Sequence, residues 1–267
     1  MPRIEINGLS IAYDLIGPVG SNGGDKAITI TPGGRFSRDT PGVRELATEL
    51  AANGYKALNL GRPLVYGASG GSREALLTAI RHPDCVSGVF CQWLSGGGIG
   101  IATLPMSYNH DPAIAASLGG MQGVAEMPPF AELLTRNPRN RELLFAWEPQ
   151  AFIRRMRDWA DWFFCAPGMP ISCVRAGELE GIKVPVVILR SGKSDIHHTR
   201  ETSEAVAAMI PGADLQEPPW GDREWMERLE GSFKEGTGLF LSMPKLVPQI
   251  LALASSCGVS PQNWSAT

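Results

Sequence analysis

PLVYGASGGSREALLTAIRHP, residues 63–83, joins an apolar run to an amphipathic pattern through a turn of small residues. The run over 64–68 predicts a buried strand, and the pattern over 72–83 predicts a helix. Between them, Gly67-Ala68-Ser69-Gly70-Gly71 fits G-x-S-x-G, in which glycine permits a strained turn that lifts the serine hydroxyl above the sheet edge. The stretch therefore indicates Ser69 as a nucleophile, with the Gly70 N–H aimed at an oxyanion. The alternative is a tight corner where only small residues fit.

Strand and helix patterns alternate on both sides of this turn. They predict two short strands within 3–16, strands over 27–31, 86–94, 184–190 and 213–220, and helices over 42–54, 199–211 and 244–258. Residues 95–181, rich in glycine, proline, methionine and aromatics, hold several further helical patterns. The alternation predicts a mostly parallel sheet covered on both faces, and the inserted helical block predicts a cap on that sheet.

The composition is that of an ordinary soluble globular protein. The 267 residues are 43% hydrophobic and 19% charged, with a formal net charge of −3, so we expect neither a nucleic-acid nor a membrane partner. The N-terminus lacks a signal-peptide core, and five cysteines at scattered spacings indicate buried thiols in a reducing cytosol. We therefore expect a cytoplasmic protein with no cofactor and no metal.

Two further stretches carry candidate site residues. Gly33-Gly34-Arg35 directly follows the strand over 27–31. It can supply a second N–H donor to an oxyanion, because glycine lets a backbone approach a substrate closely. Asp195 follows the strand over 184–190, in the chain order serine first and acid later. Its alternative role is to cap the helix that begins near Thr199.

Together these stretches resemble the α/β-hydrolase fold superfamily over nearly the whole chain. TPGGRF (31–36) is similar to the family's oxyanion loop, GASGGSR (67–73) to its nucleophile elbow, and LRSGKSDIHHT (189–199) to its acid loop. The resemblance implies that Ser69 is the nucleophile, Asp195 the acid, and the backbone of Gly34, Arg35 and Gly70 the oxyanion hole. It also implies a core formed by residues 1–94 and 182–267, with 95–181 as the helical cap.

The first departure from the family pattern concerns the catalytic histidine. Where the family has Gly-His after the last strand, this chain has Gly221-Asp222. A carboxyl with an ordinary pKa of about 3.9 is a weak base toward a serine proton, although Asp195 and Asp222 meeting at one site would raise a pKa by repulsion. His198 and His110 are the candidate substitute bases, and His198 is equally well placed to orient the acid loop.

The second departure is a short connection before the elbow. Only Gly61, Arg62 and Pro63 separate the strand candidates 56–60 and 64–68, whereas parallel neighbours need a crossover of about a dozen residues or more. One strand–helix unit of the family pattern is therefore missing here. Residues 56–63 are either an extended lead into the elbow strand or part of one long bent strand. The helix over 42–54 then becomes the crossover from 27–31 to 64–68.

The aromatic residues of the helical block bear on the substrate. Helical spacing at 152, 156, 159 and 163 favours a cap core over a substrate wall. The block's aromatics include Trp147, Trp159, Trp162, Phe163 and Phe164, while Met106, Tyr108 and Met121 are candidates for lining a pocket. This composition favours a small hydrophobic substrate.

Two functions remain open at this point. The first is a serine hydrolase of the carboxylic ester type, acting on a small hydrophobic ester, lactone or related acyl compound through Ser69, Asp195 and either His198 or Asp222. The alternative is a member without the usual triad, either a small-molecule-binding protein or a cofactor-free lyase or isomerase that uses Asp222 as a proton carrier. Both imply a small-molecule partner, and a homodimer is left open.

Overall fold

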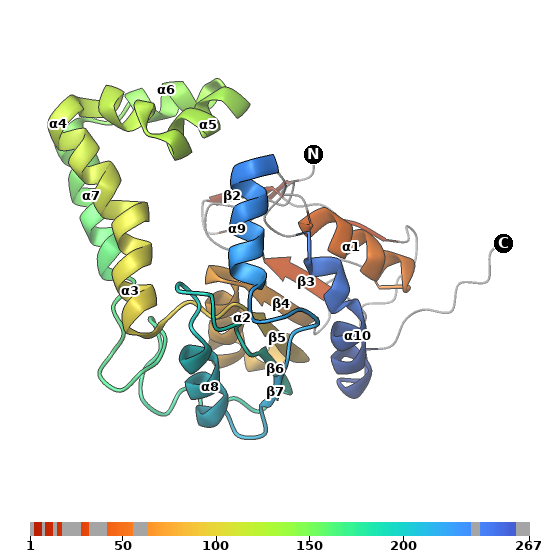
Figure 1. Ribbon diagram of the computed structural model, residues 1–267. Coiled ribbons are helices and arrows are strands. Elements are labelled where there is room, and N and C mark those ends of the chain that lie inside the picture. The colour runs from red at the N-terminus through yellow and green to blue at the C-terminus, as the bar shows by residue number, and fades with distance from the viewer. Residues whose placement is uncertain are drawn as a thin grey trace.

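The chain forms a central parallel sheet with helices on both faces and a helical arm beside it (Figure 1). The computed structural model describes residues 3–6, 9–12, 15–17, 28–31, 42–55, 63–235 and 241–259. Near the N-terminus, β1 (Arg3–Ile6) pairs with β2 (Leu9–Ala12) in an antiparallel ladder. This confirms the predicted pair of short strands within 3–16.

The main sheet has five strands in sequence order, each parallel to its neighbours. They are β3 (Ile28–Thr31), β4 (Leu64–Ala68), β5 (Gly88–Gln92), β6 (Val186–Leu189) and β7 (Asp214–Gln216). The predicted parallel sheet is confirmed, including β3 and β4 as direct neighbours. The helix between them, α1 (Val43–Ala52), lies in the predicted crossover. Residues 56–60, the other strand candidate, lie outside the described residues.

Side chains alternate between two hydrophobic layers along the strands, as the pleat requires. On β4, Leu64 and Tyr66 belong to one layer and Val65 to the other. The first layer is covered by α1, the 3-10 turn η3 (Met243–Leu246) and α10 (Val247–Ser256). The second is covered by α2 (Gly70–Arg81), which the turn η1 (Pro83–Cys85) follows, and by α8 (Arg200–Met209). Burial on both faces explains the continuous apolar runs in the sequence.

A helical arm, residues 97–161, follows β5 and leads away from the sheet (Figure 1). It comprises α3 (Gly97–Pro105), the π-helical turn η2 (Met106–His110), α4 (Asp111–Glu126), α5 (Pro128–Arg136), α6 (Arg139–Phe145) and α7 (Pro149–Asp161). The long helices α4 and α7 run side by side, and α5 and α6 lie at the far end. The arm has a hydrophobic cluster of its own around Val124, Phe152 and Met156, and it falls within the block 95–181.

One helix near the sheet was not anticipated from the sequence. α9 (Glu224–Glu235) follows β7 and lies close to the loop after β6 (Figure 1). Its sequence, EWMERLEGSFKE, is amphipathic, so the helical signal was present. Within the described segments, no helix has the length and apolar character needed to cross a bilayer.

The elbow glycine offers a direct stability test. A Cβ at Gly67 would lie 2.1 Å from the carbonyl oxygen of Gly71, a backbone atom at the start of α2. We expect Gly67→Ala to lower the unfolding free energy by about 1–3 kcal/mol or more, measured by chemical denaturation. The control is Gly98→Ala in α3, where a Cβ meets nothing within 4 Å, and we expect unchanged or slightly higher stability there. Equal effects of the two substitutions would contradict the steric explanation.

Candidate active site

Ser69 occupies the turn between β4 and α2 in a strained backbone conformation. Its φ is 56° and its ψ is −121°, a region that costs a non-glycine residue about 1–3 kcal/mol. The turn is held by the Ser69 N–H, which donates to the Gln92 carbonyl at 2.9 Å. Ser72 adds support, because its Oγ lies 2.7 Å from the Gly67 carbonyl and 2.6 Å from that of Gln92. The result is a half-buried serine at the end of β4.

His198 lies directly beside this serine. Its Nε2 is 2.8 Å from Ser69 Oγ, and its Nδ1 is 2.9 Å from Asp195 Oδ2. A carboxylate only accepts hydrogen bonds, so Nδ1 carries the proton and donates it to Asp195. Nε2 is then the acceptor for the Ser69 hydroxyl. The three side chains form one hydrogen-bonded series in which His198 is positioned to take the serine proton.

The Asp195 carboxylate is buried and organises its own loop. Besides the imidazole, its Oδ1 accepts the backbone N–H groups of His197 at 3.0 Å and His198 at 2.9 Å. Only 4% of Asp195 and 5% of His198 is exposed, so these bonds compensate a charge that would otherwise be costly to bury. Acid and imidazole therefore come from one short loop after β6.

Asp222, the other candidate partner of Ser69, is engaged in ion pairs. Its carboxylate pairs with Arg200 at 2.5 Å and with Lys193 at 3.4 Å. Burial opposes its ionisation, but the hydrogen bond from Lys193 and the charge of Arg200 outweigh it and hold the pKa of Asp222 below its usual value. Among the described residues, no hydrogen bond or ion pair joins the Asp222 side chain to Ser69 or His198. The structure thus separates Asp222 from the serine and the histidine.

The Asp222 backbone instead supports the acid loop. Its carbonyl accepts the Ser194 N–H at 3.2 Å and the Ser194 hydroxyl at 2.7 Å. A side chain at Gly192 would approach the same carbonyl to 2.9 Å, so the two segments pass close together. Arg200 also donates to the Ser191 carbonyl at 3.0 Å. The residues after β7 therefore hold the loop that carries Asp195 in place.

Of the three predicted oxyanion-hole residues, the structure describes Gly70. Gly70 is the first residue of α2, where backbone N–H groups lack an intrahelical acceptor and the helix dipole favours negative charge. Gly34 and Arg35 lie outside the described residues. His110, the other candidate base, is exposed on η2 in the arm. Within the described segments, no three His, Cys, Asp or Glu side chains converge as a metal site would require.

Aromatic side chains that the sequence did not single out surround the imidazole. The ring centroids of Trp93 and Trp225 lie 6.4 Å and 5.8 Å from that of His198. Arg228 stacks its guanidinium between them, 4.3 Å from the Trp93 ring and 4.5 Å from the Trp225 ring, and it pairs with Glu224 at 3.2 Å. Burial lowers the pKa of Arg228, against the raising effect of Glu224. α9 thus supplies one wall of the site.

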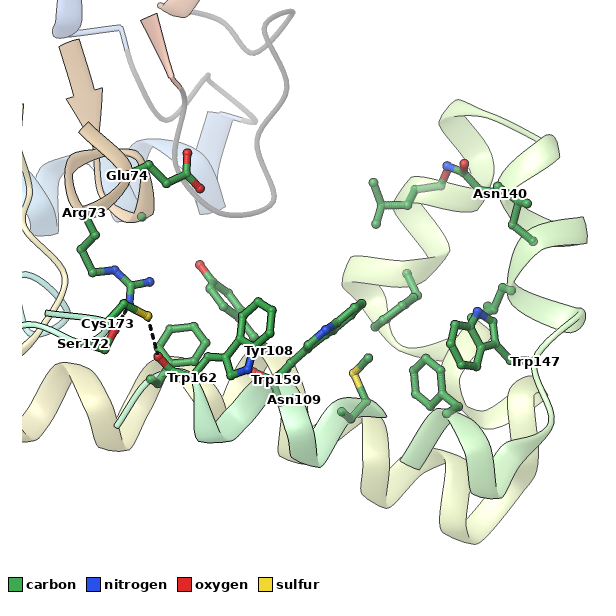
Figure 2. Close-up of a pocket in the computed structure, with 18 of the residues that line it drawn as sticks. Arg73, Glu74, Tyr108, Asn109, Asn140, Trp147, Trp159, Trp162, Ser172 and Cys173 are labelled. Atoms are coloured by element: carbon green, nitrogen blue, oxygen red, sulfur yellow. Dashed lines mark hydrogen bonds between the residues drawn. The ribbon is translucent and has the colours of Figure 1, made fainter. Parts of the chain in front are cut away.

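A groove of about 1080 Å³ begins at Gly70 and runs between α2 and the arm (Figure 2). Its aromatic lining comprises Tyr108, Phe130, Trp147, Phe152, Trp159, Trp162 and Phe163. Phe152 and Met156 are also buried in the arm core, as their spacing predicted. The same prediction is wrong for Trp159, which is 42% exposed, and Phe163 also lines the groove. Trp162, outside that spacing, is 67% exposed. Of the three candidate lining residues, Tyr108 lines the groove, Met121 is buried in the arm and Met106 is exposed.

Comparison with solved structures places this architecture among known folds. The chain superposes on MGS-M2, an α/β-hydrolase enzyme from a Medee basin deep-sea metagenome library, with a TM-score of 0.58 and 14% identity, covering 99% of this chain and 100% of that one. The chain has the α/β-hydrolase fold. The enol-lactonase from Burkholderia xenovorans LB400 matches with a TM-score of 0.53 and 17% identity over 94% of this chain and 100% of that one.

A hydrolase from Pseudomonas aeruginosa PA01 gives a TM-score of 0.51 and 17% identity over 87% of this chain and 96% of that one. No protein-family model and no curated protein sequence matches the chain. The strand and the helix that the sequence predicted on either side of Ser69 are present, because β4 ends at Ala68 and α2 begins at Gly70. The arm in turn occupies the sequence block in which the resemblance implied a cap.

His197, which lies in the acid loop, should make the stability of the protein depend on pH. Burial, then the charges of His198 and Arg228, lowers the pKa of His197 against the opposing effect of Asp195. In the unfolded chain His197 has an ordinary pKa of about 6.5, so the unfolded chain binds a proton more readily than the folded one. The neutral form of His197 therefore favours the folded state, and this stabilisation is lost as the pH falls below that value. We expect the unfolding free energy of the wild type, relative to His197→Gln, to decrease between pH 7.5 and 5.5. No decrease relative to His197→Gln would contradict this assignment, and the exposed substitution His82→Gln, which keeps His197, is the control.

Proposed function

We propose that this chain is a serine hydrolase that cleaves an ester, lactone or related acyl compound with a hydrophobic group. The observation that carries the proposal is the hydrogen-bonded series from Ser69 through His198 to Asp195, with distances of 2.8 Å and 2.9 Å. A nucleophile within hydrogen-bond reach of a base, which a third group orients, is the arrangement that nucleophilic catalysis requires. The fold, shared with hydrolases of low identity, is compatible with it.

The proposed reaction begins with the Ser69 hydroxyl. As Oγ attacks the carbonyl carbon, its proton passes to His198 Nε2, and the charge that develops on the carbonyl oxygen is held by the Gly70 N–H. Collapse of this intermediate breaks the bond to the leaving group, which takes the proton from His198. Water then attacks the acyl-enzyme, His198 accepts its proton, and the release of the acid restores Ser69. Throughout, Asp195 holds the imidazole in the tautomer that leaves Nε2 free to accept.

Gly34 and Arg35 remain the proposed source of the second oxyanion donor. Their position directly after β3 supports this role, because β3 is the neighbour of the elbow strand β4 in the sheet. Asp222 has no proton-transfer role in this proposal, since it is paired with Arg200 and Lys193. The binding-protein, lyase or isomerase alternative rested on the absence of a histidine base. His198 beside Ser69 removes that reason.

The groove supports a substrate with a sizeable apolar group. It opens at Gly70, next to the proposed oxyanion site, and its far wall is aromatic. A cavity of about 1080 Å³ is at the upper end of ordinary ligand sites. The apolar part of the substrate would lie along the arm, where it would remove Trp159 and Trp162 from water. The arm thus serves as the proposed cap.

The triad assignment can be tested with a fluorophosphonate probe, which phosphonylates an activated serine. We expect labelling at Ser69 in the wild type and none in Ser69→Ala. His198→Ala and Asp195→Asn should slow labelling by about 10³-fold or more, because the base or its tautomer is lost. The matched control is Asp222→Asn, for which we expect near-wild-type labelling. Fast labelling of His198→Ala, or slow labelling of Asp222→Asn at unchanged stability, would contradict the assignment.

The groove makes a second prediction, about chain length. p-Nitrophenyl octanoate and p-nitrophenyl acetate share a leaving group and differ in their apolar tail. We expect Trp159→Ala to reduce kcat/KM for the octanoate about tenfold and to leave the acetate nearly unchanged, since lost apolar contact costs on the order of 1–3 kcal/mol. Phe164→Ala, an exposed aromatic that does not line the groove, is the control. Equal losses for the two esters would exclude the groove as the tail site.

A further inference from the structure

Arg73 is a cation that lines the groove together with Gly70, the residue that follows Ser69 in the chain. It lies in the first turn of α2, four residues after Ser69 in the sequence. Its side chain extends toward the loop that carries Ser172 and Cys173 (Figure 2). The guanidinium carbon lies 5.1 Å from the centre of the Phe163 ring, and Nη1 donates to the Ser172 hydroxyl. Phe163 and Ser172 thus fix the direction of the guanidinium.

The positive charge of Arg73 has no ion-pair partner among the residues that the structure describes. Its Nε is buried and has no hydrogen-bond acceptor. Burial lowers the pKa of Arg73, although an arginine remains charged at neutral pH. Because Nε has almost no accessible surface and Nη1 already donates to Ser172, an anion in the groove would meet the outer N–H groups at Nη1 and Nη2.

The groove around Arg73 is otherwise apolar or neutral, with one exception. Glu74, the other charged residue among the described part of the lining, is exposed and extends from α2 in a different direction (Figure 2). Against the effect of burial, its negative charge raises the pKa of Arg73. A single guanidinium suits one planar carboxylate, which it binds through two parallel N–H···O bonds. Beyond Arg73 the wall consists of Tyr108, Trp159 and Trp162. The groove therefore has Gly70 and Arg73 on the α2 side and an aromatic wall on the arm side.

We propose that Arg73 binds a carboxylate of the substrate, so that the site takes amphipathic acyl compounds with a carboxylate close to the scissile carbonyl and an apolar group along the arm. The identity of the reacting bond rests on the proposed function, but the anion subsite does not. Arg73 acts here as a specificity residue, and Ser69 and His198 carry the reaction. Neutral esters of the same length lack the group that this cation would bind.

Binding to Ser69→Ala protein separates this proposal from hydrolysis. The probes are 4-phenylbutyrate and its primary amide, which have the same skeleton and differ in charge, titrated by calorimetry. We expect the carboxylate to bind at least tenfold more tightly than the amide. Adding Arg73→Gln should weaken carboxylate binding about tenfold or more and change amide binding less than twofold, because only a charge-assisted hydrogen bond is lost. Arg73→Lys, which keeps the charge, should retain part of the preference.

The matched control is Arg81→Gln on the same helix. Arg81 is exposed and pairs with Glu178 at 2.6 Å, so its loss should leave both affinities unchanged. Three results would overturn the subsite: no binding of the carboxylate, no preference for it over the amide, or equal weakening of both ligands by Arg73→Gln. Fluorophosphonate labelling of Ser69 is read separately. Labelling without carboxylate preference refutes the subsite alone, and carboxylate preference without labelling refutes the hydrolase alone.

Discussion

The buried carboxylate of Asp195 is the constraint on which the site depends. It accepts two backbone N–H groups from its own loop and the imidazole N–H of His198. The first two bonds fix the loop, and the third fixes the ring within it. An acid and a base that come from separate loops must be aligned by the whole sheet. Here both belong to the segment 195–198 of one loop, and the sheet has only to bring that loop to Ser69.

The residues after β7 help to hold the acid loop in its position. The Asp222 carbonyl accepts both Ser194 hydrogen bonds, and its carboxylate pairs with Arg200 and Lys193. Asp222 stands where the family pattern has its histidine. In this chain, its backbone carbonyl and its carboxylate both bind the acid loop or the helix that follows it. These structural contacts explain an aspartate at position 222 without a catalytic role.

The serine side of the site is rigid for an independent reason. The strained Ser69 backbone is held by Ser72 and Gln92 through buried hydrogen bonds, and close contact at Gly67 leaves the turn no room to relax. The groove, by contrast, leaves large aromatic surfaces of the arm in contact with water. The tightly held turn at Ser69 therefore lies next to an aromatic groove whose apolar area a ligand would bury. Arg73 lies where these two parts meet.

The sequence by itself determined the elbow, the parallel order of the sheet and the helical block, because these depend on local patterns of apolar residues and small turn residues. It identified Asp195 from its place after a strand. The sequence could not decide between His198 and Asp222 as the partner of Ser69, since Ser69 and His198 are 129 residues apart. They meet because the parallel strands β4 and β6, with β5 between them, end at the same edge of the sheet. Likewise, helical spacing shows which arm residues share a face, but only packing decides what covers that face. Phe152 is covered by the arm itself, and Trp159 faces the groove.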